Sequence, residues 1–188
     1  MKVKALMIIA VAALVAVYAV PGFILQLEAQ STGSIKSKSI EARLRTLEDR
    51  EEIRQLMIDY GRTLDQRDFA GFSKLFAQDA EYGGGGGTGM TKGAEAIAKL
   101  LEDVFQKNPT NLNTPNFHLF CNEIIKVDGD KASALSKGVF VVRGNNNMPE
   151  SVMLATYKDV FVRENGVWKF KQRIVQGDIP SAQSSRQQ

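Results

Sequence analysis

The spacing of apolar residues changes its period once along this 188-residue chain, and that change restricts the folds open to it. Between residues 40 and 105, apolar residues recur every three or four positions, which is typical of amphipathic helices. From Asn116 onward the period is two, and Val, Ile, Phe and Tyr dominate, as in strands. Helices gathered at the front and strands at the back predict an α+β domain with helices packed on one face of a sheet.

Three helices are predicted in the first part of the domain. The first carries one long apolar stripe, formed by Ile40, Leu44, Leu47, Ile53, Leu56, Met57, Tyr60 and Leu64. A short second helix covers residues 69–76. A third covers residues 94–105, and Pro109 marks its end.

Two dipeptides, Asp128-Gly129 and Asn165-Gly166, predict hairpin turns in the second part. Each stands between two strand-like segments, residues 124–127 and 131–142 for the first dipeptide and residues 151–163 and 167–176 for the second. Strands joined by turns this short are antiparallel. We therefore expect a four-stranded antiparallel meander, with a short earlier strand near Glu81-Tyr82.

An uncharged run over residues 5–25 follows Lys2 and Lys4, which is the pattern of an export signal. The run is also long enough to span a membrane, so a retained anchor is the alternative. Pro21-Gly22 interrupts it near its end and favours cleavage. We expect a signal peptide or membrane anchor over residues 1–29, a flexible tether over 30–39, the folded domain over 40–179 and a disordered tail over 180–188. The folded domain would then be periplasmic or secreted.

Composition excludes several classes of protein. A single cysteine excludes a disulfide scaffold, and a single histidine, His118, argues against a zinc site. The net charge is +3, with basic and acidic residues interleaved, which is unlike a nucleic-acid-binding surface. We therefore expect no metal site and no nucleic-acid partner.

The glycine run Gly83–Gly87, followed by Gly89, matches the phosphate-binding pattern G-x-G-x-x-G. Any run of five glycines produces such a match, and the βαβ context that the pattern requires is missing. Met90 stands where a P-loop would have lysine. A lid or spacer loop is the better interpretation.

His118 is the residue most suggestive of chemistry, because an imidazole exchanges protons near neutral pH. Alternation places it with Phe120 and Asn122 on one face of a strand. Polar groups there would be costly in a dry core and useful in a cavity. A solvent-facing or merely hydrogen-bonded histidine is the alternative.

Seven motifs then occur in order: Tyr60-x4-Asp65-x2-Asp68, Leu75-Phe76-x2-Asp79-Ala80, Gly93-x3-Ile97, His118-x3-Asn122, Asp128-Gly129-Asp130-x-Ala132, Tyr157-x-Asp159 and Trp168-x4-Arg173. On these motifs, the stretch from about Ile40 to Asp178 resembles the SnoaL-like families of the nuclear transport factor 2-like superfamily. That group includes scytalone dehydratase, bile acid 7α-dehydratase and ketosteroid isomerase.

The resemblance implies a cone-shaped α+β barrel, with three helices packed on a curved antiparallel sheet that encloses a pocket, often in a homodimer. It implies a cofactor-free dehydratase or isomerase acting on a small hydrophobic hydroxy or keto compound. The catalytic residues carried over are Tyr60, Asp65, His118 and Arg173, with Phe120, Asn122 and Tyr157 contacting substrate. One alternative is a protein that binds a small apolar ligand without turnover. Another is an assembly domain whose pocket is filled by its own aromatic residues, Phe117, Phe120, Phe140 and Trp168.

The implied catalytic set makes two geometric demands. Tyr60 and Asp65 lie about 140° apart on an ideal helix, so they reach one pocket only if the sheet wraps the helix or the helix frays near Asp65. Arg173 shares its strand parity with Lys169 and Lys171, so it faces inward only if the larger apolar residues face elsewhere or a β-bulge intervenes.

Overall fold

The computed structural model describes residues 39–84, 89–107, 115–144 and 146–179. The chain forms two compact units, Met1–Leu47 and Glu48–Gln188. In the first unit, residues 39–47 are helical, and the side chains of Ile40, Leu44 and Leu47 are exposed. The predicted signal peptide or anchor (residues 1–29), the tether up to residue 38 and the tail (180–188) lie outside the described residues. Those predictions therefore stay untested.

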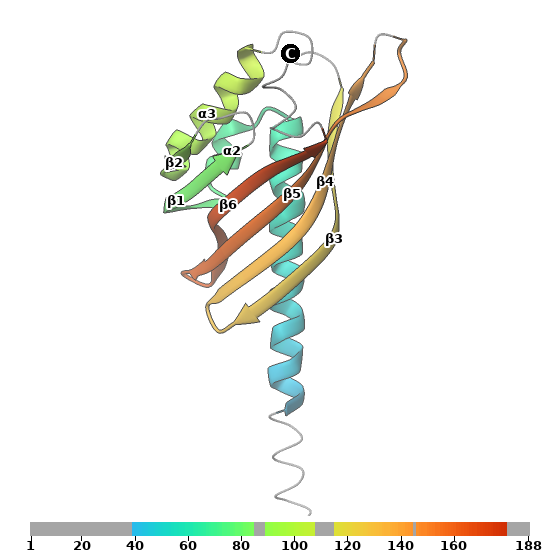
Figure 1. The fold of residues 1–188 in the computed structure, drawn as a ribbon. Coiled ribbons are helices and arrows are strands. Elements are labelled where there is room, and N and C mark those ends of the chain that lie inside the picture. Colours follow the sequence, from blue (N-terminus) through green and yellow to red (C-terminus); the bar gives the residue numbers. More distant parts are fainter. Residues whose placement is uncertain (1–38, 85–88, 108–114, 145, 180–188) are drawn as a thin grey trace, which may run out of the picture. The chain divides into compact units, whose positions relative to one another are not determined.

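The second unit begins with a helix over residues 48–65, which we call the first helix. The elements that follow are α2 (Phe69–Ser73), β1 (Phe76–Gly84), β2 (Met90–Lys92), α3 (Ala94–Lys107), β3 (Asn116–Asp128), β4 (Lys131–Arg143), β5 (Pro149–Glu164) and β6 (Val167–Ile179) (Figure 1). None of the described helices is long and apolar enough to cross a membrane.

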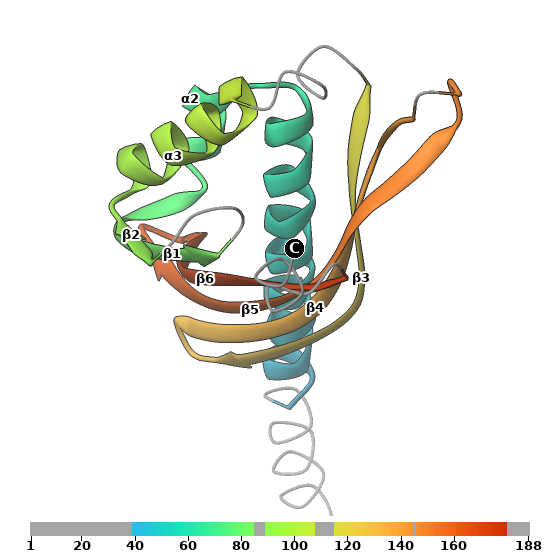
Figure 2. The ribbon, with the colours of Figure 1, turned by 45° about the horizontal axis from the view of Figure 1, so that its top comes forward.

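The six strands form one open sheet in the order β2-β1-β6-β5-β4-β3. The predicted antiparallel meander is confirmed as β3 to β6. The sheet as a whole is mixed, because β1, which lies outside the meander, pairs with β6 in parallel. The sheet curves around the first helix, while α3 packs against β1 and β2 (Figure 2). The α+β class is therefore confirmed, with a sheet that does not close into a barrel.

The two predicted hairpin turns are both present. Glu164 pairs with Val167, so Asn165 and Gly166 form a two-residue loop, and both have positive φ, of 51° and 81°. That is the backbone of a type I′ turn, whose twist matches the flanking strands. In the other hairpin the loop is Gly129-Asp130, one residue later than the dipeptide suggested.

The second predicted helix is too long. α2 ends at Ser73, and Phe76 begins a nine-residue strand. The strand predicted near Glu81-Tyr82 is thus the end of β1. Phe72 and Phe76 are four residues apart and are both buried in the core. A continuing helix would bury residues at this spacing, and so does a helix that is followed by a strand, so the apolar pattern does not distinguish the two.

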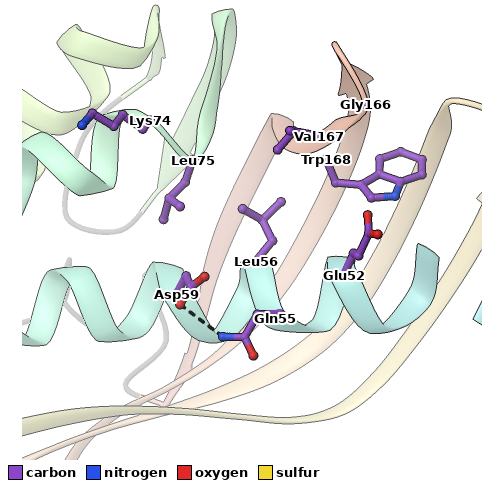
Figure 3. A pocket seen from close by; sticks show the side chains of 9 residues that line it. All are labelled: Glu52, Gln55, Leu56, Asp59, Lys74, Leu75, Gly166, Val167 and Trp168. Carbon is purple, nitrogen blue, oxygen red and sulfur yellow. Dashed lines mark hydrogen bonds between the residues drawn. The ribbon is translucent and has the colours of Figure 1, made fainter. Parts of the chain in front are cut away.

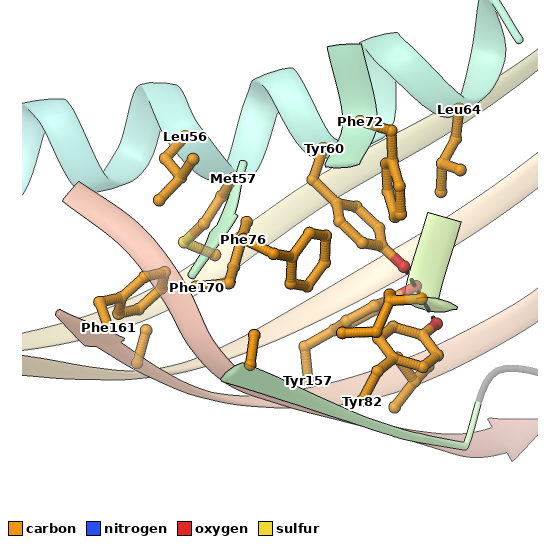
Figure 4. Close-up of a cluster of buried hydrophobic side chains, with 14 of the residues drawn as sticks. Leu56, Met57, Tyr60, Leu64, Phe72, Phe76, Tyr82, Tyr157, Phe161 and Phe170 are labelled. Atoms are coloured by element: carbon orange, nitrogen blue, oxygen red, sulfur yellow. Dashed lines mark hydrogen bonds between the residues drawn. The ribbon is translucent and has the colours of Figure 1, made fainter. Parts of the chain in front are cut away.

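Side chains from the first helix, α2 and the inner face of the sheet meet in one core, whose members include Leu56, Met57, Tyr60, Leu64, Phe72, Phe76, Tyr82, Tyr157, Phe161 and Phe170 (Figure 4). The ring of Tyr60 lies within 6.4 Å, centroid to centroid, of five other aromatic rings. Burial along the predicted helical stripe begins at Ile53, and the earlier members of the stripe are exposed. Periodicity identifies the apolar face of a helix, but it does not say where the core begins.

The structure describes the first two glycines of the glycine run, and both belong to the sheet. Gly83 and Gly84 end β1 and pair with Ile174 and Val175 of β6. Gly84 has φ of +83°, and a Cβ added there would collide with the carbonyl oxygen of Val175. Glycine is needed at this position because the β1 backbone passes directly against β6. Residues 85–88 lie outside the described residues.

We expect Gly84→Ala to lower the free energy of unfolding by more than about 4 kcal/mol, because it combines backbone strain with a steric clash in the sheet. Gly129→Ala is the matched control, since Gly129 also has positive φ but a Cβ there would meet nothing within 4 Å. That control should cost only about 1–2 kcal/mol. Urea unfolding of both variants measures the difference, and equal losses would contradict the account of Gly84.

Candidate active site

Asp65 and His118 form a two-point contact between the end of the first helix and β3. Asp65 Oδ1 lies 2.6 Å from His118 Nδ1, and Asp65 Oδ2 accepts a hydrogen bond of 3.0 Å from the backbone N–H of His118. The carboxylate thus holds both the ring and the backbone of the same residue. The two groups lie 53 positions apart in the chain, so the fold itself creates the pair.

The pair is close because the first helix packs directly on β3 at Gly61. A Cβ at Gly61 would lie 3.0 Å from His118 Cβ and 3.1 Å from Phe120 Cε2. Asp65 follows one turn later on the same side, as the last helical residue. The chain then leaves the helix through Arg67, whose φ is 60°.

The imidazole of His118 is held by Asp65 at Nδ1 and by Phe140 on its face. Its ring stacks on Phe140 with 4.5 Å between centroids, and its side chain is 8% exposed, against 19% for Asp65. A carboxylate accepts hydrogen bonds but cannot donate them, so the bond from Nδ1 places the proton of the neutral ring on Nδ1. Nε2 then carries the lone pair and is able to accept a proton, while Asp65 stabilises the imidazolium that results.

A second polar cluster surrounds Arg173, deep in the core. Arg173 Nε and Nη2 donate to the two carboxylate oxygens of Asp159 at 2.8 and 2.9 Å, and both side chains are 0% exposed. Four aromatic rings lie around the guanidinium, those of Tyr60, Phe120, Tyr157 and Phe170, at 3.9–5.3 Å. Burial lowers the pKa of Arg173, but the carboxylate of Asp159 outweighs burial and the pKa is raised. Arg173 therefore stays charged.

Arg173 faces inward because of a β-bulge in β6. Phe161 pairs with Phe170 and Val160 with Gln172, so Lys171 is an extra residue that shifts the parity. Phe170 and Arg173 consequently share the inner face. The bulge was one of the two conditions under which the sequence allowed an inward Arg173.

Three tyrosines complete this cluster. The hydroxyls of Tyr60 and Tyr82 lie 3.1 Å apart. Burial raises the pKa of Tyr82 to about 12, and burial likewise raises the pKa values of Tyr60 and Tyr157. All three phenols stay protonated near neutral pH and remain hydrogen-bond donors.

The structure thus brings the predicted catalytic residues together in two groups, Asp65 with His118 and Tyr60 with Arg173. Phe120 lies between the groups. A Cβ added at Gly61, beside His118, would lie 3.1 Å from its ring, and the ring is 6.0 Å from that of Tyr60 and 5.0 Å from that of Tyr157. The five-residue separation of Tyr60 from Asp65 directs them to different parts of the curved sheet.

Asn122 does not join either group. It is exposed and has φ of 53°, at a bulge between Cys121 and Ile124. The expectation that alternation continues from His118 to Asn122 is wrong, because the bulge interrupts the period. Phe117, which only the assembly-domain alternative placed in the pocket, is 57% exposed on the opposite face.

Three residues of these groups were not singled out as site residues from the sequence. Phe140 stacks on His118 from the paired position of β4, Asp159 neutralises Arg173, and Tyr82 meets the hydroxyl of Tyr60. Asp159 belongs to a quoted motif, so its spacing from Tyr157 carried a signal. For Phe140 and Tyr82 the signal exists only once strand pairing is known.

A groove of about 400 Å³ lies on another flank of the first helix, lined by Glu52, Gln55, Leu56, Asp59, Lys74, Leu75, Gly166, Val167 and Trp168 (Figure 3). It contains none of the predicted site residues. In the part of the chain that the structure describes, no three His, Cys, Asp or Glu side chains are grouped to hold a metal ion.

Comparison with known proteins agrees with this architecture. The SnoaL-like domain model matches residues 45–174. An uncharacterized protein of Mycobacterium tuberculosis is 29% identical over 132 residues, which are 68% of this chain and 84% of the relative. Among solved structures, an NTF2-like protein with a cystatin-like fold from Novosphingobium aromaticivorans has a TM-score of 0.68 at 30% identity, over 78% of this chain and 93% of that chain. A candidate scytalone dehydratase from the same organism has a TM-score of 0.59 at 26% identity, over 70% of this chain and 85% of that chain.

The buried tyrosines predict a specific behaviour at alkaline pH. In a Tyr18→Phe variant only Tyr60, Tyr82 and Tyr157 remain, and tyrosinate absorbance should stay low in the folded protein through pH 11. A folded-state pKa raised above the unfolded value of 10.0 contributes stability below pH 10 that is lost as pH rises, by up to about 1.4 kcal/mol per pH unit for each tyrosine. Urea midpoints between pH 9 and 11 measure this decline. Titration of all three tyrosines near pH 10 in the folded state would refute it.

Proposed function

The chain belongs to the SnoaL-like domain family, and we propose that it is a cofactor-free dehydratase or isomerase acting on a small hydrophobic hydroxy or keto compound. The observation that carries the proposal is the 2.6 Å contact between Asp65 Oδ1 and His118 Nδ1. An imidazole oriented by a carboxylate through one nitrogen, with the other available, is the arrangement that general acid–base catalysis requires. The similarity to a candidate scytalone dehydratase supports the same reaction class.

In this proposal His118 moves one proton. Nε2 takes a proton from the carbon next to the substrate carbonyl, and the electrons of the broken C–H bond form an enolate. The imidazolium, stabilised by Asp65, then returns that proton. Return to the departing hydroxyl on the β-carbon releases water and leaves a C=C bond, whereas return to another carbon gives an isomer. Neither route needs an oxidant, a reductant or a metal.

The second cluster supplies the hydrogen-bond donors for the substrate oxygen. Arg173 Nη1 is buried without a hydrogen-bond partner, while Nε and Nη2 are bound to Asp159. The guanidinium lies over the ring of Tyr60 at 3.9 Å, and the hydroxyl of Tyr60 lies 3.1 Å from that of Tyr82. Fixed donors in a dry interior stabilise a developing negative charge strongly, because they need no reorganisation. Phe120, between the two clusters, would contact the apolar part of the substrate, and Tyr157 would pack beside it.

The test is to incubate the protein with a panel of hydroxy-ketones and steroids and to follow loss of water, or isomerisation, by mass spectrometry and chromatography. We expect turnover of at least one class, with His118→Gln and Asp65→Asn each losing most of it. The double variant should lose little more than either single variant, because the two residues act as one unit. Asp103→Asn, which changes an exposed carboxylate on α3, should retain full activity.

Binding of a panel compound without turnover would contradict the enzyme and favour a carrier of small apolar ligands. Neither binding nor turnover would favour an assembly domain. Full activity in Asp65→Asn would exclude the coupled pair even if an enzyme were found.

We further propose that the folded domain is exported, by a signal peptide or on an anchor formed by residues 5–25. The support is the uncharged run behind Lys2 and Lys4. A fusion of residues 1–39 to a reporter that works only after export should be active, and Val11→Arg with Leu14→Arg should abolish that activity. Activity only in a cytoplasmic reporter would contradict export.

The homodimer implied by the resemblance also remains a proposal.

A further inference from the structure

We propose that Phe105, in the last turn of α3, is the positioning residue that keeps Asp65 and His118 aligned. Phe105 acts on the pair from two sides, through Arg67 beside Asp65 and through Phe140 under the ring of His118. The catalytic value of this role rests on the proposed function. The positioning itself is a property of the free protein, and it can be measured without a substrate.

Phe105 is the last member of the apolar stripe of α3. Ile97, Leu101 and Phe105 recur every four residues and are all buried, so they form one face of the helix. α3 ends two residues later, at Lys107. Its last turn lies close to the point where the chain leaves the first helix, because Arg67 reaches over the ring of Phe105 (Figure 2). Phe105 is thus the member of the stripe that meets the helix end next to Asp65.

Arg67 connects Phe105 to the carboxylate of the pair. Its Cζ lies 4.1 Å from the centre of the Phe105 ring, and its Nη1 donates to the backbone carbonyl of Leu64 at 2.6 Å. Arg67 has φ of 60°, a left-handed conformation that a residue with a side chain keeps only where the surroundings hold it. Burial lowers the pKa of Arg67 and the negative charge of Asp65 opposes that change, so the two charges interact. The contact with Phe105 therefore fixes the turn that follows Asp65.

Phe140 connects Phe105 to the imidazole of the pair. The rings of Phe105 and Phe140 lie 6.4 Å apart, centroid to centroid, at an interplanar angle of 81°, which is a favourable edge-to-face contact. Phe140 stacks on His118 at 4.5 Å and 27°, from the paired position on β4. By packing against Phe140, Phe105 limits the movement of the ring on which His118 rests.

One side chain of α3 thus supports both partners of a bond that joins the first helix to β3. The 2.6 Å contact between Asp65 Oδ1 and His118 Nδ1 needs the carboxylate and the ring in place together, because hydrogen bonds weaken steeply when they are misaligned. Loss of the Phe105 ring would loosen both partners at once. A residue that only fills the core would instead change stability without changing which nitrogen of His118 carries the proton.

The test is nitrogen-15 NMR of His118, the one histidine of the chain, in the full-length protein in mild detergent. Phe105→Leu keeps an apolar side chain but removes the ring that contacts Arg67 and Phe140. We expect the ratio of Nδ1-protonated to Nε2-protonated imidazole to fall by roughly three- to tenfold, the range typical of a residue that acts on a site through its neighbours. Urea unfolding of the same samples measures the accompanying change in stability.

Ile97→Val is the matched control, because Ile97 lies about two turns earlier on the same buried face of α3. It should lower stability and leave the tautomer ratio as in the wild type. Phe140→Leu tests the second contact without altering α3, and it should lower the ratio in the same direction as Phe105→Leu. Adding Phe105→Leu to Asp65→Leu should change the ratio no further, because the preference that Phe105 supports has already been lost.

An unchanged ratio in Phe105→Leu or in Phe140→Leu would overturn the proposal. So would an equal fall in Ile97→Val, or a wild type without a preference for Nδ1. These measurements need no turnover, so a failure of the positioning role is distinguishable from a failure of the proposed function. If the compound panel yields a substrate, Phe105→Leu should lower kcat and leave KM unchanged, and a rise in KM at constant kcat would contradict the role.

Discussion

The first helix touches β3 without an intervening side chain at Gly61, and the geometry of the candidate site depends on that close approach. A larger residue would move the helix away from the strand, and the bond between Asp65 and His118 would lengthen with it. Hydrogen bonds weaken steeply with distance and misalignment, so a shift of an ångström would uncouple the pair. The curvature of the sheet serves the same contact, because it turns β3 toward the helix end where Asp65 stands.

The second constraint is the buried charge of Arg173. A guanidinium with no exposure is stable only when it is paired, and removal of one partner of such a pair typically costs about 3–5 kcal/mol. Asp159 supplies the pairing, and the faces of four aromatic rings supply further favourable electrostatics. The predicted catalytic residues therefore lie in two polar clusters, and Phe120 lies between them. In the reaction that we propose, proton transfer belongs to Asp65 and His118, and charge stabilisation belongs to the cluster around Arg173.

Local patterns predicted most of the elements. Asn165-Gly166 predicted a hairpin turn correctly, because both residues readily adopt positive φ. The third helix and the antiparallel meander lie where the apolar periodicity predicted them. Parallel pairing of β1 with β6 was missed, since strands 91 positions apart, as at Glu81 and Gln172, leave no local trace. Two β-bulges changed the directions that simple alternation gives to predicted site residues. The bulge at Lys171 turns Arg173 inward, and the bulge at Asn122 leaves Asn122 exposed. Asp65 was linked to His118 only through the family resemblance, because contacts across 53 residues depend on the complete fold.

The claim at the centre of this account is that Asp65 holds the neutral imidazole of His118 with its proton on Nδ1. Nitrogen-15 NMR tests it directly, and the presence of a single histidine removes any ambiguity of assignment. At a pH where the ring is neutral, the wild type should show a protonated Nδ1 and an unprotonated Nε2, and Asp65→Leu should lose that preference. A wild-type ring protonated on Nε2, or a tautomer that Asp65→Leu leaves unchanged, would contradict the account.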